Sequence, residues 1–137
     1  MAYDIFWEKR GVYRRYAGFI SSEELAESIL AVEHDVRFDT IRYVINDFIA
    51  CERIAYSPQK IMEISAIDGA AEQSNPNIRI AIVADKPDVR AVGEAYVAAG
   101  MNTFPTQLFW TVAEARAWTN EDVAPTFIAP RLPARNR

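Results

Sequence analysis

The chain alternates between short segments in which apolar and polar residues take turns and longer segments in which apolar residues recur every three or four positions. Alternation predicts β-strands, and the longer period predicts helices. Two aromatic-rich alternating segments lie on either side of Gly11, which predicts an antiparallel hairpin. Further strands are predicted over residues 41–48, 77–84 and 105–110.

Four segments with helical spacing carry residue types that commonly begin and end helices. They span residues 21–35, 57–73, 86–100 and 111–120. The predicted caps are Ser21 or Ser22, Ser57 (followed by Pro58) and Thr111 at amino ends, and Gly100 at a carboxyl end. The order is therefore ββαβαβαβα, an α/β fold with a mixed, mainly parallel sheet and an N-terminal antiparallel hairpin.

The pattern predicts one domain over residues 1–120 and helices mainly on one face of the sheet. We expect the helices to cover the face with Ile41, Tyr43, Ile45, Ile78, Ile80 and Ile82. The opposite face would then carry Val44, Ala81 and Val83, together with Arg42 and Arg79. The strand arginines, including Arg14 and Arg15, are expected to be solvated rather than gathered as an anion site.

Residues 121–137 contain three prolines and no hydrophobic period, which predicts an extended or disordered arm. The second face is too apolar to remain bare. We expect the arm or a second copy of the chain to cover it, and we favour a homodimer that uses this face or the edge of the hairpin.

Composition narrows the class of protein. Net charge is −4, and residues 123–137 hold three arginines and no acid, so the rest of the chain is more acidic than the whole. An acidic body disfavours nucleic acid as a partner. No apolar run approaches the ~20 residues of a membrane span, and no secretory signal is visible, so no integral membrane segment is expected. The single cysteine, Cys51, excludes an internal disulfide and suits the cytoplasm.

Three segments resemble the SpoIIAA-like fold of the STAS superfamily, which includes the anti-sigma-factor antagonists. They are "RYVINDF", "NPNIRIAIVA" and "LFWTVAEARAW", and the resemblance covers roughly residues 3–119. The chain is most similar in kind to small stand-alone bacterial SpoIIAA-like proteins of uncharacterised function. The resemblance implies the fold and a regulatory role through a protein partner.

Better-known members carry a phosphorylated serine just after the acidic end of the central strand. Here Asp47 is followed by Phe48, Ile49, Ala50 and Cys51, none of which bears a hydroxyl group. Ser57 is the serine at the helix start, after a longer predicted loop. It is a possible phosphoacceptor, but an N-cap before proline is the favoured role.

The predicted interaction or ligand loop comprises Asp47, Phe48, Cys51, Tyr56 and Ser57. Asp47 is either a metal or phosphate-relay carboxylate or, as we favour, an acceptor for loop amides. No cluster of metal ligands, no cofactor motif and no catalytic set is visible. Apolar neighbours and Glu52 should raise the pKa of the Cys51 thiol, which disfavours a nucleophile.

The sequence therefore favours a non-enzymatic regulatory or protein-interaction module. The alternative is a small-ligand domain for a lipid or nucleotide, because the related CRAL-TRIO architecture holds lipids. That alternative requires a cavity beneath residues 48–56.

Overall fold

The structure is a computed structural model that describes residues 2–120. Its elements follow the predicted order, with one additional 3-10 helix, η1. They are β1 (Tyr3–Trp7), β2 (Gly11–Ile20), α1 (Ser22–Glu33), η1 (Val36–Thr40), β3 (Tyr43–Ile54), α2 (Pro58–Ala71), β4 (Arg79–Val83), α3 (Pro87–Ala99), β5 (Thr106–Phe109) and α4 (Val112–Thr119). The predicted α/β fold is confirmed. The predicted arm, residues 121–137, lies outside the described residues.

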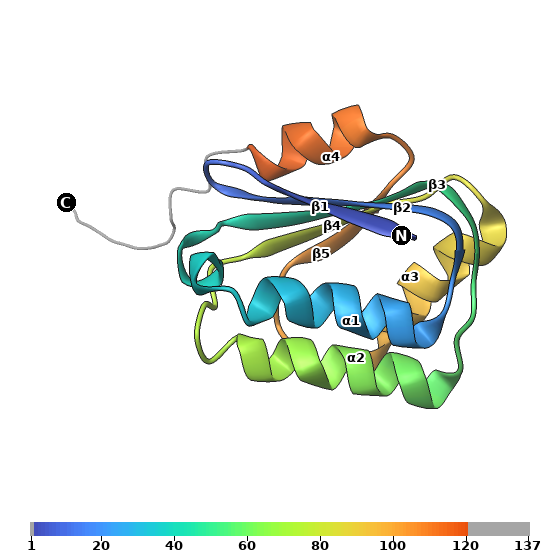
Figure 1. Cartoon of the computed structure of the whole chain (residues 1–137), viewed down its shortest axis with the longest axis horizontal. Helices are drawn as coiled ribbons and strands as arrows, with labels where there is room; N and C mark the ends of the chain where they lie inside the picture. Colours follow the sequence, from blue (N-terminus) through green and yellow to red (C-terminus); the bar gives the residue numbers. More distant parts are fainter. Residues whose placement is uncertain (1, 121–137) are drawn as a thin grey trace.

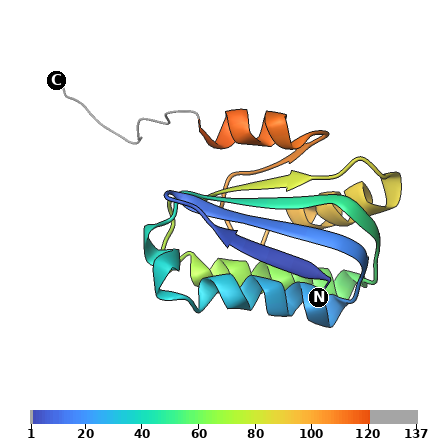
Figure 2. The ribbon, with the colours of Figure 1, turned by 45° about the horizontal axis from the view of Figure 1, so that its top comes forward.

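The five strands form one sheet in the sequential order β1-β2-β3-β4-β5. β1 and β2 are antiparallel, and the other neighbours are parallel. Helices α1, α2 and α3 cover one face of the sheet, and α4 lies on the opposite face (Figures 1 and 2). None of the helices in residues 2–120 is long and apolar enough to cross a membrane.

The predicted helix ends are confirmed where the structure tests them. Ser21 caps α1 and exchanges hydrogen bonds with Glu24, so it rather than Ser22 is the N-cap. Thr111 caps α4 in the same way with Glu114. Gly100 ends α3 with a φ of 63°, a left-handed conformation that glycine adopts without steric cost.

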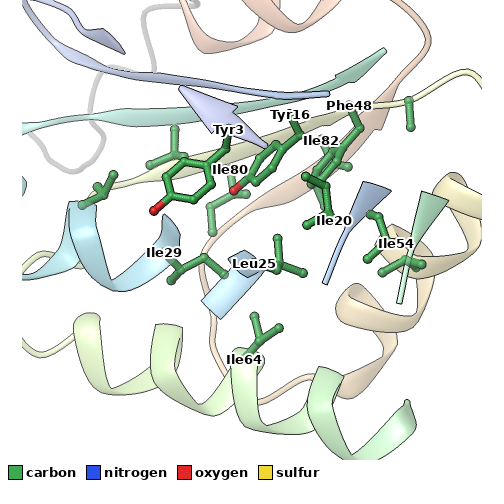
Figure 3. Packing of buried hydrophobic residues seen from close by; sticks show 14 of the residues in the cluster. Tyr3, Tyr16, Ile20, Leu25, Ile29, Phe48, Ile54, Ile64, Ile80 and Ile82 are labelled. Atoms are coloured by element: carbon green, nitrogen blue, oxygen red, sulfur yellow. The ribbon is translucent and has the colours of Figure 1, made fainter. Parts of the chain in front are cut away.

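The main core lies between the sheet and α1–α3 (Figure 3). The strands contribute Val44, Ile80 and Ile82 to this core, and the helices contribute Leu25, Ile29, Ile61, Ile64, Val89 and Val92. A second, smaller core lies under α4 and contains Tyr43, Ile45, Ala81, Val83 and Ala115.

The predicted assignment of faces was therefore wrong for β3. Val44 pairs with Ile80, and Ile45 pairs with Ala81, so Val44 faces the three large helices while Tyr43 and Ile45 face α4. Both faces of β3 are apolar. The alternation of residues along such a strand therefore does not reveal which alternate residues face α1–α3 and which face α4. Pairing register decides this, because a shift of one residue exchanges the two faces.

The cover of the second face also differs from the expectation. Helix α4 packs on Tyr43, Ile45, Ala81 and Val83 of this face, whose cover the expectation had assigned to the arm or a second copy. Arg116 of α4 binds the carboxylate of Glu8 through two hydrogen bonds of 2.9 and 2.7 Å. This contact holds the pKa of Glu8 below its usual range. The last helix is thereby joined to the end of the first hairpin strand.

Candidate interaction site

The strands β2 and β3 extend beyond the rest of the sheet at its carboxyl edge. β3 pairs with β4 only as far as Asp47 and Val83, whereas it pairs with β2 as far as Ile54 and Ile20. In Figure 1 this extension curves toward the amino ends of α1 and α2 at the right of the molecule. Residues 49–54, which follow the predicted strand and were predicted as loop, are therefore strand, and that prediction was wrong.

Asp47 lies on the α4 side of the sheet and is buried. Its carboxylate accepts hydrogen bonds from the Tyr13 hydroxyl and, at 2.9 Å, from the Ile49 amide. Burial and the hydrogen bond to Asp47 raise the pKa of the Tyr13 hydroxyl to about 12. Among residues 2–120, no three His, Cys, Asp or Glu residues lie close enough together to hold a metal ion. The structure thus gives Asp47 the acceptor role.

Phe48 and Cys51 belong to the interior of the extension. The Phe48 ring stacks on Tyr16, with centroids 4.4 Å apart. Cys51 is fully buried, and burial raises the pKa of its thiol, as the sequence led us to expect. Both Phe48 and Cys51 therefore contribute to the core rather than to a surface.

Tyr56 and Ser57 are the two predicted site residues that reach the surface. Tyr56 is 47% exposed. The Ser57 hydroxyl oxygen accepts a hydrogen bond of 3.2 Å from the Lys60 amide, which confirms the predicted N-cap. The first turn of α2 contains no acidic residue. Its amino end therefore keeps an uncompensated partial positive charge.

Two further residues at this edge, Phe19 and Arg53, were not among the predicted site residues. They are opposite each other in the β2–β3 pairing, and both face outward because their neighbours Ile20 and Ile54 are buried. Phe19 is 53% exposed, and the Arg53 guanidinium lies 5.7 Å from its ring centroid. Extending the predicted strand to Ile54 would have placed both on the surface. We define the carboxyl-edge patch as Phe19, Arg53, Tyr56 and Ser57.

A polar network crosses the main core behind this edge. Arg14 is buried, which corrects the expectation of a solvated strand arginine. Its guanidinium donates hydrogen bonds of 2.9 Å to the Asn46 side chain and to the Ser28 carbonyl oxygen. The Tyr16 hydroxyl is 2.6 Å from the Ser28 hydroxyl. The network ties β2 and β3 to α1.

A pair of carboxyl groups lies between the carboxyl-terminal halves of the helices. Glu33 of α1 shares a hydrogen bond with Asp68 of α2, and burial together with this contact raises the pKa of Glu33 far above its usual range. The Tyr96 hydroxyl of α3 donates to Asp68 at 2.5 Å and accepts from Asn102 at 3.0 Å. The raised pKa favours the protonated form of Glu33, in which the carboxyl group is the donor to Asp68.

The main core also contains a cavity of about 60 Å³, which extends beneath Phe48 and Ile54. Its wall is apolar except for Arg14, Tyr16, Asn46 and Tyr96, whose polar groups have partners already described. Pockets for small organic ligands occupy about 300–1,000 Å³. The space required for a lipid beneath residues 48–56 is therefore not present in this conformation.

Replacing Ser57 by alanine is expected to lower the free energy of unfolding by about 1 kcal/mol, because the Lys60 amide loses its acceptor. Urea denaturation followed by circular dichroism measures this change. The matched control is Ser74→Ala, which changes an exposed serine beyond the carboxyl end of α2. An equal effect of the two substitutions would contradict the capping role.

The sequence matches no protein-family model and no curated protein sequence. Solved structures are similar over most of their length. An anti-sigma factor antagonist from Mycobacterium paratuberculosis is 18% identical, with a TM-score of 0.60 over 87% of this chain and 93% of that one. The Bacillus cell fate determinant SpoIIAA in its phosphorylated form is 11% identical, with a TM-score of 0.55 over 85% and 98%. An uncharacterised protein with a SpoIIAA-like fold from Shewanella loihica is 13% identical, with a TM-score of 0.57 over 86% and 93%.

Proposed function

Because this chain has the SpoIIAA-like fold, we propose that it is a non-enzymatic regulatory module that binds another protein through the carboxyl-edge patch. The observation that carries the proposal is the exposure of two aromatic side chains, Phe19 and Tyr56, beside the amino end of α2. Exposed aromatic residues on a rigid edge are typical anchors of protein interfaces. Two of the similar structures are anti-sigma factor antagonists or SpoIIAA, which supports a regulatory partner for this fold.

The patch suits a partner surface that offers an apolar side chain next to a carboxylate. Phe19 and Tyr56 supply apolar area, while Arg53 and Lys60 are exposed cations. The uncompensated amino end of α2 adds to the positive potential. Arginine beside an aromatic ring is a frequent combination at binding hot spots.

In this proposal Ser57 acts first as the cap of α2. A phosphoserine there would remain close to the positive helix end, and mass spectrometry of protein from the native host tests whether Ser57 is phosphorylated.

We also propose a cytoplasmic location. We further propose a homodimer formed through the β1 edge or through the part of the α4-bearing face of the sheet that α4 leaves uncovered, where Phe6 is 50% exposed. Sedimentation velocity of the full chain tests the dimer.

The test of the docking surface begins with affinity purification from the native host, which identifies the bound protein. The dissociation constant of the purified pair is then measured by calorimetry for the parent chain and for Phe19→Ser/Tyr56→Ser. We expect the double substitution to weaken binding about ten-fold or more, as for the loss of two aromatic anchors. Circular dichroism verifies that the variant is folded.

The matched control is Val97→Ser, an exposed apolar side chain on α3 that is 45% accessible. It should leave the dissociation constant unchanged. The proposal fails if the two variants weaken binding equally, or if no protein is bound by the parent chain.

A further inference from the structure

A long groove separates α1 from α2 on the surface that faces away from the sheet. Its volume is about 590 Å³. The floor is apolar and is formed by Ala26, Leu30, Ile64 and Ile67. We call this feature the α1–α2 groove. It is distinct from the carboxyl-edge patch, since it follows the length of the two helices.

The rim of the groove carries an excess of negative charge. Glu23, Glu27 and Glu63 line it, and the one lysine among its lining residues is Lys60. Lys60 lies 3.5 Å from the Glu63 carboxylate, and both side chains are about half exposed. The groove therefore fits an occupant that combines apolar side chains with positive charge.

One segment of the chain has this composition. Residues 123–137 hold three arginines and no acidic residue, and their bulky apolar residues are Val123, Phe127, Ile128 and Leu132. In Figures 1 and 2, α4 ends at the same end of the molecule as α1 and α2. Helix α4 therefore ends at the same end of the molecule, although on the opposite face of the sheet, as the part of the groove that is lined by His34 and Ile67.

We propose that residues 123–137 dock in the α1–α2 groove of their own chain. Fifteen residues span up to about 50 Å when extended. A domain of this size is roughly 35 Å across, so the segment can pass from the α4 layer to the opposite layer. Arg131 and Leu132 follow Asn120 by 11 and 12 residues, so an extended chain reaches roughly 35–40 Å at that point. Leu132 would meet the apolar floor, and the arginines would meet the rim carboxylates.

Other arrangements fit the charges less well. The part of the α4-bearing face of the sheet that α4 leaves uncovered carries exposed Arg15 and Arg53. These two cations repel a basic segment. Groove-to-groove contact between two copies would place acidic rims against each other. Docking on a second copy competes with a tethered segment, whose effective concentration is in the millimolar range for a short linker. Docking within one chain is therefore favoured.

Paramagnetic relaxation in the full-length protein tests the proposal. A nitroxide is attached to the cysteine introduced by the substitution Ala134→Cys. The native Cys51 is fully buried, so it is protected from the label. We expect amide signals of α1 and α2 along the groove to broaden, and those in the first turns of α3 to remain sharp. Glu27→Gln/Glu63→Gln should reduce the docking constant about five-fold, the usual scale for two exposed ion pairs.

The control variant is Glu94→Gln, an exposed carboxylate on α3 that should leave the broadening unchanged. Salt supplies a test without substitution, because about 0.5 M sodium chloride should weaken docking by screening. Absent or uniform broadening would overturn the proposal. So would an equal effect of the control variant, or broadening that appears when labelled chains are mixed with separate ¹⁵N-enriched chains.

Discussion

Replacing Arg14 by alanine is expected to lower the free energy of unfolding by about 3 kcal/mol, the scale for removing one partner from a buried charged network. The guanidinium satisfies the Asn46 amide oxygen and the Ser28 carbonyl oxygen, and both Arg14 and Asn46 are buried. Alanine would leave these acceptors without their charged donor and enlarge the adjoining cavity. Urea denaturation at pH 7 measures the loss.

The neighbouring residue provides the control for this substitution. Arg15 points to the opposite face and is exposed, so Arg15→Ala should change the free energy of unfolding by no more than about 0.5 kcal/mol. Arg14→Met separates volume from hydrogen bonding, since it fills space but donates nothing. A cost for Arg14→Ala no greater than that for Arg15→Ala would contradict the structural role of the network.

The second large effect concerns pH. Burial and Asp68 raise the pKa of Glu33 in the folded chain, whereas in the unfolded chain this glutamate titrates near its ordinary value of about 4.3. Above that value the unfolded chain releases the proton and the folded chain keeps it. Stability from this group therefore falls as pH rises, by up to about 1.4 kcal/mol per pH unit, until the folded pKa is reached.

The groups that face Glu33 determine this behaviour. After burial, Asp68 of α2 is the group that disfavours its charged form, while Arg14 of β2 acts in the opposite direction. Because the outer part of the side chain contacts water, we expect a loss of about 2 kcal/mol between pH 6 and pH 8. Urea denaturation at several pH values measures it.

Glu33→Gln isolates the contribution of the proton. The glutamine amide donates to Asp68 at every pH, so this variant should be less sensitive to pH than the parent and more stable at pH 8. The matched control, Glu94→Gln, should follow the parent curve. Parallel stability curves for the parent and Glu33→Gln between pH 6 and pH 8 would show that no buried proton is shared.

The elements of the fold were predictable because their signals are local. Gly11 directly follows the hairpin turn as the first residue of β2, and Ser57, Thr111 and Gly100 lie at the helix ends where their chemistry predicts them. Such signals depend on a few neighbouring residues. The order of elements then follows from reading the chain once.

What could not be predicted depends on pairing between distant segments. The acidic residue Asp47 suggested a strand end, yet β3 continues because β2 supplies partners as far as Ile20. Arg14 resembles a solvated arginine in sequence, and only the approach of α1 and Asn46 buries it. Phe19 and Arg53 were missed for the same reason. The site could not be derived from the sequence without the β2–β3 register.

The contact between Glu8 and Arg116 has a consequence for synthesis of the protein on the ribosome. These residues are 108 positions apart, so their ion pair forms only after almost the whole domain has been translated. Until then α4 is missing, and the apolar face with Tyr43, Ile45, Ala81 and Val83 has no helix to cover it. A nascent chain with an open apolar sheet is prone to association and is a suitable client for chaperones. Release of the last helix from the exit tunnel is thus the step that completes the surface of the sheet.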